Sequence, residues 1–146
     1  MNQKIEKIIS GFCGVWELIS EKCSYSNGEP PKSGTYEINL DRDKVHFHVS
    51  WEDKDSKKFQ VEFAGIPDGI KYPYEDNPHV DTVKYEITSA GNFISTAYKG
   101  NLLLNEASRV LSEDGNFLYV TQKVLGVDGE LHANSSVYKR RKAKFA

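Results

Sequence analysis

The chain has 146 residues and a formal net charge of -2, with 38% hydrophobic, 12% aromatic and 27% charged residues. This is the composition of an ordinary soluble globular protein, and the length suits a single core, so we expect residues 1–146 to form one domain. Because 19 Lys and Arg residues stand against 21 Asp and Glu residues, the chain lacks the global positive field that phosphate-driven nucleic-acid binding requires. No nucleic-acid partner is predicted.

The first ten residues predict a short amphipathic helix. Ile5, Ile8 and Ile9 recur at helical spacing, Asn2 is available as an N-terminal cap and Gly11 as a stop. A helix here would cover an open end of the structure that follows. Charges are mixed through this segment and it lacks a continuous apolar stretch, so it does not have the pattern of a secretory signal.

Cys13 and Cys23 are predicted to be free thiols. If both lie on one extended strand, they are roughly 33 Å apart, which is far beyond disulfide reach. Free thiols are typical of a reducing compartment, and no apolar run approaches the roughly 20 residues that a membrane-spanning helix needs. The sequence therefore predicts a cytoplasmic protein without a membrane span.

From residue 12 onward, apolar and polar residues alternate with the period of two that is typical of β-strands. Hairpin turns such as Asp114-Gly115 and Asp128-Gly129 join successive segments. Prolines make segment 23–33 irregular and allow segment 65–78 at most a short strand. The pattern predicts an all-β fold, an antiparallel up-and-down β-barrel of 8–10 strands with a short N-terminal helix. The nine predicted strands are 12–20, 35–40, 45–51, 58–63, 80–88, 92–99, 102–111, 117–125 and 131–140.

Three motifs carry a resemblance to a known superfamily. Gly14-Val15-Trp16-Glu17-Leu18, the late Asp114-Gly115 hairpin and Ser136-Val137-Tyr138-Lys139-Arg140 resemble the calycins, which include lipocalins, cytosolic fatty-acid-binding proteins and small bacterial lipocalin-like domains. The small lipocalin-like domains are also similar in segments 69–81 and 108–112. The resemblance implies a barrel whose first and last strands pair, with an apolar cavity open at one end.

The chain departs from the fatty-acid-binding proteins in two respects. Those proteins carry Arg-x-Tyr on the last strand as a carboxylate clamp, whereas this chain has Ser136 in the arginine place and Tyr138 in the tyrosine place. They also have a helix-turn-helix lid between the first two strands, and segment 23–33 is too short and too rich in proline for one. The resemblance is therefore better to the small lipocalin-like domains.

Arg109 is the first candidate for a ligand contact. A guanidinium inside an apolar barrel would bind an anionic head group, because this satisfies buried donors and offsets their desolvation. Alternation does not decide whether Arg109 points inward, since both faces of segment 102–111 combine apolar and polar residues. A solvated surface arginine is the alternative.

Aromatic residues complete the predicted ligand-binding set, because a concave apolar site is usually lined by aromatic rings with few polar anchors. They are Phe47, Trp51, Tyr72, Tyr98 and Tyr138. The resemblance implies that Tyr138 points inward, where its hydroxyl would bind a ligand head group or a buried water. Packing without a ligand role is the alternative for each. Trp16 resembles a structural tryptophan at the closed end of the barrel.

No metal site and no cofactor is predicted. His46 and His48 share one face of a strand, as two metal ligands would, but they oppose the apolar residues that should take the interior. His79 lies in a proline-rich segment and His132 stands alone on the last predicted strand, so the sequence places no further ligand beside the pair.

The function predicted from these observations is non-catalytic binding of a small hydrophobic or amphipathic ligand in a barrel cavity, as a carrier or sensor. One alternative is an enzyme that isomerises or cyclises a hydrophobic substrate in the same cavity, with Asp68 or Asp81 as the base. Another is an interaction module with a filled barrel. The protein is expected to be a monomer or a homodimer.

Overall fold

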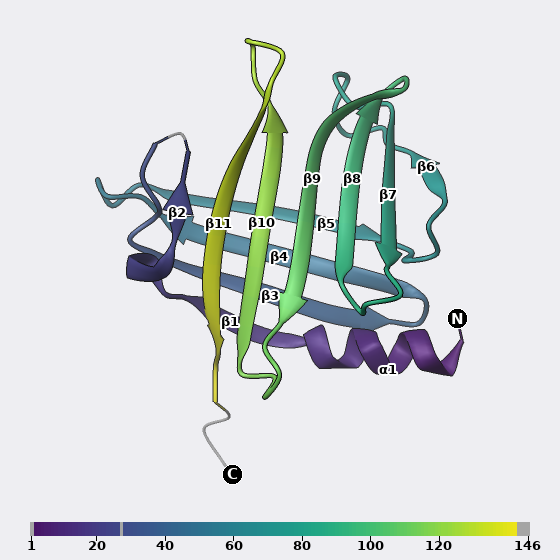
Figure 1. The fold of residues 1–146 in the computed structure, drawn as a ribbon, viewed down its shortest axis with the longest axis horizontal. Helices are drawn as coiled ribbons and strands as arrows, with labels where there is room; N and C mark the ends of the chain where they lie inside the picture. Colours follow the sequence, from purple (N-terminus) through teal and green to yellow (C-terminus); the bar gives the residue numbers. More distant parts are fainter. Residues whose placement is uncertain (1, 27, 143–146) are drawn as a thin grey trace.

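The computed structural model describes residues 2–26 and 28–142, which form one α-helix, a short 3-10 turn and eleven antiparallel strands (Figure 1). All nine predicted strands are present, and the three-residue β6 lies in segment 65–78, for which the sequence allowed at most a short strand. The elements are α1 (Gln3–Phe12), β1 (Gly14–Leu18), η1 (Ser20–Lys22), β2 (Ser24–Tyr25), β3 (Ser33–Asp41), β4 (Lys44–Glu52), β5 (Lys58–Gly65), β6 (Lys71–Pro73), β7 (Thr82–Ile87), β8 (Phe93–Lys99), β9 (Leu102–Leu111), β10 (Phe117–Leu125) and β11 (Leu131–Arg140).

The predicted N-terminal helix is confirmed. Asn2 caps it, since its side-chain oxygen accepts a hydrogen bond of 2.9 Å from the backbone N–H of Ile5. The helix continues through Gly11, which was expected to stop it, and ends at Phe12. Ile9 and Phe12 are buried, so the apolar stripe packs on the sheet. No helix in residues 2–26 or 28–142 combines the length and apolar character needed to cross a membrane.

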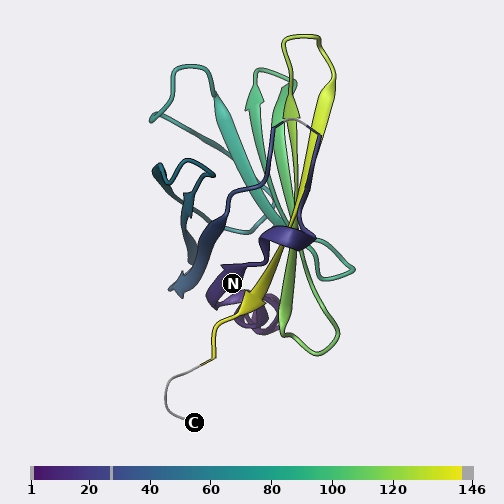
Figure 2. The ribbon, with the colours of Figure 1, turned by 90° about the vertical axis from the view of Figure 1, so that its left-hand side faces the viewer.

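The sheet has the order β5-β4-β3-β1-β11-β10-β9-β8-β7-β6, so nearly every strand pairs with its neighbour in sequence. The first strand also pairs with the last, with Trp16 opposite Arg140, as the resemblance implied. Figure 2 shows two layers, β3–β5 and β8–β11, that approach each other at α1 and diverge away from it. The predicted all-β, lipocalin-like up-and-down architecture is confirmed.

The barrel is open along one side, because β5 and β6 are the two ends of the strand order. The end of β5 nevertheless packs against β7. A Cβ added to Gly65 would lie 2.1 Å from the ring of Tyr85, so glycine is required there. The N–H of Gly69 also donates to the carbonyl of Tyr85 at 2.9 Å. These contacts join the end of β5 and the segment that follows it to β7, the neighbour of the edge strand β6.

Trp16 and Arg140 close the end of the barrel that α1 covers. Trp16 is 0% exposed, and its indole N–H donates to the carbonyl of Phe12 at 2.9 Å. The guanidinium carbon of Arg140 lies 4.1 Å from the centre of the tryptophan ring. Its N–H groups donate to the carbonyls of Gly115, Cys13 and Gly11 at 3.0, 2.9 and 2.7 Å. The structural role predicted for Trp16 is confirmed.

Two expectations about segment 13–33 need correction. Ser24 and Tyr25 form β2, which pairs with Ser135 and Asn134 of β11, although the segment was expected to be irregular. Cys13 and Cys23 are both free thiols, as predicted. They are not on one extended strand, however, because β1 ends at Leu18 and η1 turns the chain before Cys23.

Candidate binding cavity

A cavity of about 750 Å³ lies between the two layers of the barrel. Its size falls within the range of small-molecule sites in proteins, roughly 300–1,000 Å³. Its lining begins at the buried residues Tyr36, Tyr85 and Arg109. The two strand layers diverge with distance from α1 (Figure 2). Loop residues Glu29, Pro31, Asp53, Tyr74 and Asn77 lie at the opposite end. The cavity is thus closed at the α1 end and approached from the loops.

The wall formed by β3, β4 and β5 is mainly apolar. Val49 and Trp51 of β4 line it, together with Val61 and Phe63 of β5. The register of β4 and β5 places these side chains on one face, because Val49 stands opposite Val61 and Trp51 opposite Phe59. The Trp51 and Phe59 rings are stacked with their centroids 5.5 Å apart. This wall provides an apolar surface for a ligand.

Arg109 lies at the deep end of the cavity and is 1% exposed. Strand β9 places it between Phe93 of β8 and Val120 of β10, its cross-strand partners, so it points inward. Its guanidinium carbon lies 4.5 Å from the ring centre of Phe47 and 5.5 Å from that of Phe93. The rings form a cradle under the cation.

The polar contacts of Arg109 are to neutral groups. Its Nε–H donates to the hydroxyl of Tyr36 at 2.7 Å, and Nη2 donates to the hydroxyl of Ser95 at 3.1 Å. A third, longer bond of 3.5 Å runs from Nη1 to the carbonyl of Ala107. No carboxylate in residues 2–26 or 28–142 forms an ion pair with Arg109. A buried guanidinium without a counter-ion is unusual, because burying a charge is costly unless it is paired.

Buried tyrosines surround the guanidinium. Tyr138 of β11 lines the cavity, and its ring lies 5.2 Å from that of Tyr36. Burial raises the pKa of Tyr138 well above its usual range, and it raises the pKa of Tyr85 to about 12. Both phenols are therefore neutral at physiological pH. None of the hydrogen bonds between described residues involves the Tyr138 hydroxyl, so it is available to a ligand in the cavity.

The structure brings four of the six predicted ligand-binding residues together. Arg109, Tyr138 and Trp51 line the cavity, and Phe47 packs directly beneath the guanidinium of Arg109. The sequence pattern left the direction of Arg109 open, and the register of β9 places it inside. Tyr36 was not among the predicted ligand-binding residues. It lies on the same inward face as Ile38, however, and the alternation of the sequence already indicated that this face is buried.

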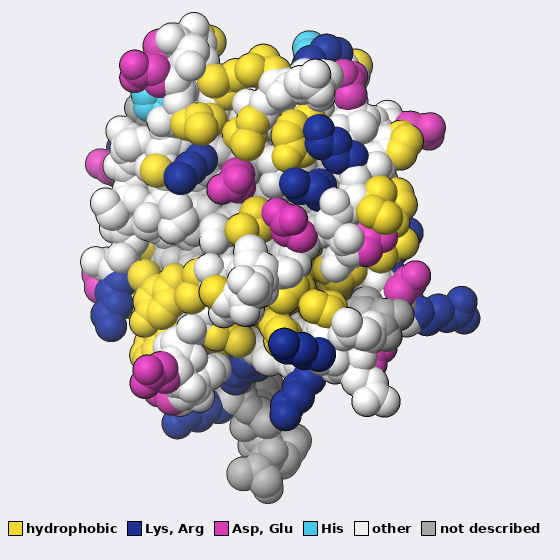
Figure 3. All heavy atoms as spheres, turned by 45° about the vertical axis from the view of Figure 1, so that its right-hand side comes forward, with side chains coloured by type: hydrophobic (Ala, Val, Ile, Leu, Met, Phe, Trp, Pro, Cys, Tyr) yellow, Lys and Arg dark blue, Asp and Glu magenta, His cyan; other side chains and the backbone are white. Residues whose placement is uncertain are grey.

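Tyr98 and Tyr72 do not line the cavity, which corrects their predicted place in its wall. Tyr98 lies on the outer face, with the amines of Lys71 and Lys84 at 4.0 and 5.9 Å from its ring centre. Tyr72 lies on the short β6, and its hydroxyl donates to the carboxylate of Asp68. Figure 3 shows basic, acidic and hydrophobic side chains interspersed on the face of the molecule that it presents.

The two carboxylates proposed as catalytic bases also lie outside the cavity lining. Asp68 accepts hydrogen bonds from Tyr72 and from the N–H of Ile70. Asp81 accepts from the N–H of Gly100 at 2.7 Å. These bonds give both carboxylates a local structural role. The enzyme alternative therefore loses the bases on which it depended.

The histidines behave as their alternation indicated. Val45 and Phe47 are buried, whereas His46 is exposed and His48 bonds the side chain of Gln60 at 3.0 Å on the outer face. The described residues contain no cluster of three or more His, Cys, Asp or Glu that could hold a metal ion.

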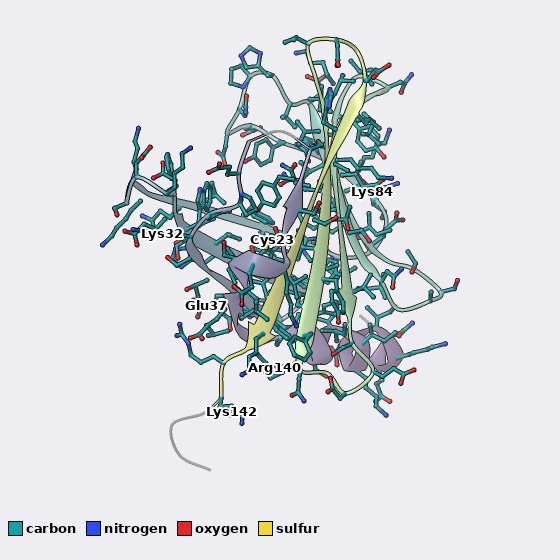
Figure 4. All side chains as sticks on the ribbon, turned by 60° about the vertical axis from the view of Figure 1, so that its left-hand side comes forward. Cys23, Lys32, Glu37, Lys84, Arg140 and Lys142 are labelled. Carbon is teal, nitrogen blue, oxygen red and sulfur yellow. The ribbon has the colours of Figure 1, made fainter. Side chains whose placement is uncertain are left out.

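Figure 4 shows Arg140 beside α1. This arginine, whose hydrogen bonds go to backbone carbonyls, therefore marks the closed end of the barrel.

No protein-family model matches the chain, and neither does any curated protein sequence. Among solved structures, an S-type phycobiliprotein lyase from Guillardia theta is similar over 96% of this chain and 94% of its own, at 11% identity and a TM-score of 0.61. The zebrafish ileal bile acid-binding protein complexed with cholic acid is similar over 90% of this chain and 99% of its own, at 15% identity and a TM-score of 0.52. The siderocalin Ex-FABP matches 90% of this chain and 71% of its own, at 10% identity and a TM-score of 0.51. At these identities the similarity shows the fold alone, and it confirms the predicted calycin-like fold.

Proposed function

We propose that this protein binds a small amphipathic acid in its barrel cavity, as a non-catalytic carrier or sensor. The observation that carries the proposal is Arg109, a buried cation with no carboxylate partner in the described chain, at the deep end of a cavity of about 750 Å³. An acidic ligand would supply the missing counter-ion. Two of the five guanidinium N–H groups remain after the three described bonds, enough for a bidentate contact.

The apolar wall would supply most of the affinity. Burying ~300 Å² of apolar ligand surface at ~25 cal/mol per Å² gives ~7 kcal/mol before the costs of association. In this binding mode the ligand body contacts Val49, Trp51 and Phe63, and its acidic group reaches Arg109. The Tyr138 hydroxyl donates a further hydrogen bond to that group.

Structural neighbours support the general proposal. The zebrafish neighbour is described as a bile acid-binding protein, and the siderocalin is described as having dual ligand specificities. Proteins with this fold thus hold small molecules. Because the identity to this chain is low, these neighbours do not indicate which ligand it binds. The ligand class has to be inferred from the residues that line the cavity.

A single cytoplasmic domain is part of the proposal. Two free thiols support a reducing compartment. Burial raises the pKa of the Cys13 thiol, which keeps it protonated and unreactive at neutral pH. The N-terminal helix, the single continuous sheet and the seam between Trp16 and Arg140 support one domain over residues 1–146.

Occupation of the cavity is tested with a matched pair of variants. Ala107 lines the cavity and the adjacent Ser108 faces outward. Ala107→Trp fills the interior, and Ser108→Trp places the same ring on the outer surface. We expect an apolar fluorescent probe to bind the unmodified protein and Ser108→Trp saturably, oleate to displace it, and Ala107→Trp to lose binding while keeping its circular dichroism spectrum. Equal binding by a folded Ala107→Trp protein would refute the proposal, as would the absence of both saturable probe binding and a native mass-spectrometric adduct in the unmodified protein.

A further inference from the structure

The wall opposite the apolar one carries a row of uncharged polar side chains. Asn105 of β9, Gln122 of β10 and Asn134 of β11 all line the cavity. Gln122 stands directly opposite Asn134 in the register of β10 and β11. Asn105 stands opposite Val124, which places it diagonal to Gln122. The three carboxamides are therefore neighbours on the inner face of one sheet.

Most of the hydrogen-bonding capacity of this row is unused within the described chain. The side-chain oxygen of Asn134 accepts one bond of 3.1 Å, from the N–H of Ser26. The side chains of Asn105 and Gln122 make no hydrogen bond to other described residues. Each carboxamide offers two N–H donors and one oxygen acceptor. The row can both donate to and accept from hydroxyl or carbonyl groups of a bound molecule.

The three carboxamides lie at different distances from Arg109 along the strands. Arg109 pairs with Val120, and Gln122 lies two residues nearer the loops on the same inner face, roughly 7 Å farther along the strand. Asn105 lies four residues from Arg109 on β9, roughly 13 Å away by the same spacing. Across the cavity, the facing residues Val49, Trp51 and Val61 are apolar. One end of the cavity is thus cationic, one side is polar and the other is apolar.

We infer that the ligand is a rigid acid with two unlike faces, which carries hydroxyl or carbonyl groups along one face and hydrocarbon along the other. This inference rests on the proposed function and specifies its ligand class. Such a molecule places its acidic group on Arg109 and its polar face on Asn105, Gln122 and Asn134. A linear fatty acid is polar only at its head, so it would cover the three carboxamides with hydrocarbon and leave their donors and acceptors unpaired.

A matched pair of probes tests the inference. Cholate and lithocholate share a ring system and a carboxylate, but lithocholate lacks most of the ring hydroxyls. Asn105→Leu and Gln122→Leu each keep a side chain of similar size and remove the carboxamide. Thr121→Val is the control, because it removes a polar group from the outward face of β10. Affinities are measured by titration calorimetry. We expect each leucine variant to bind cholate roughly 2- to 10-fold more weakly and lithocholate with less than about a twofold change, since each variant removes one neutral hydrogen bond.

The outcomes separate this inference from the proposed function. Equal losses for both steroids in the leucine variants, or no loss for either, would overturn the inference. The same holds if the unmodified protein binds oleate but neither steroid, and in that case the proposed function stands. If the protein binds neither steroid nor oleate, both proposals fail. Thr121→Val is expected to leave all affinities unchanged. If this variant lost as much affinity for cholate as the leucine variants do, while its affinity for lithocholate stayed the same, that result would also count against the carboxamide row.

Discussion

Replacing Arg109 with methionine removes the buried cation and keeps a side chain of similar length. The guanidinium is almost fully enclosed, lies 4.5 Å from the Phe47 ring centre and has no carboxylate partner in the described chain. We expect Arg109→Met to fold, because replacing a buried charge with an apolar side chain is often neutral for stability or favourable. The hydroxyls of Tyr36 and Ser95 lose a donor but retain their own O–H groups for other bonds.

The expected effect is on acidic ligands only. A hydrogen bond to a charged group contributes about 1.5–3 kcal/mol, which corresponds to roughly 10- to 150-fold in affinity. Arg109→Met should therefore weaken oleate binding by this factor. Oleyl alcohol has the same chain without the carboxylate, so its affinity should change little. The measurement is displacement of an apolar fluorescent probe by each ligand, at a pH where the carboxylate is ionised.

The control for this experiment is Lys123→Met, which removes an exposed cation from the outward face of β10. It should leave both affinities unchanged. The reasoning is refuted if folded Arg109→Met binds oleate as tightly as the unmodified protein. It is equally refuted if oleate and oleyl alcohol lose affinity to the same extent, because the loss would then come from altered packing instead of a missing counter-ion.

Two further predictions concern stability. Arg140→Met removes three hydrogen bonds to backbone carbonyls and the 4.1 Å contact with Trp16, so urea denaturation should show a loss of about 3 kcal/mol, and an unchanged midpoint would contradict the closing role of this arginine. Burial raises the pKa of Tyr85 to about 12, so the unfolded chain releases this phenol proton at a lower pH than the folded chain does. The contribution of Tyr85 to stability is complete below about pH 10 and should fall by about 2–3 kcal/mol as the pH rises to about 12, in addition to the decline that the raised pKa of Tyr138 causes. Tyr85→Phe should make this alkaline decline shallower, whereas Tyr119→Phe, on the exposed outer face, should not.

The strands of this fold were predictable because each has one face toward a core. Alternation located all nine of the longer strands, and turn residues such as Asp114-Gly115 fixed the hairpins between them. The two-residue β2 was missed, because Ser24 and Tyr25 have no periodic pattern of their own. They are held by pairing with β11 and by a hydrogen bond of 2.9 Å between the hydroxyls of Tyr25 and Ser136. Local sequence does not encode a contact of that kind.

The site was predictable only in part, because two faces of a strand can look alike. On β8, Phe93, Ser95 and Ala97 face inward, so alternation places Tyr98 outside despite its aromatic character. On β9 both faces contain leucines, and only the cross-strand partners decide that Arg109 is inside. Gln122 shares its face with Leu118 and Val120, which are buried. Extending the alternation of β10 to polar residues would have found it.

A comparison of the buried Arg109 with the partly buried Arg140 shows why one arginine is structural and the other is available to a ligand. Arg140 bonds three backbone carbonyls at 2.7–3.0 Å, and these acceptors cannot turn away without unfolding the closed end. Arg109 bonds two side-chain hydroxyls and makes one longer contact of 3.5 Å to a carbonyl. Hydroxyls rotate at small cost and can donate to an incoming carboxylate while still accepting from the guanidinium. Arginine therefore has two roles in this fold. Arg140 stabilises the closed end of the barrel, and Arg109, at the deep end of the cavity, keeps a charge that an acidic ligand would neutralise.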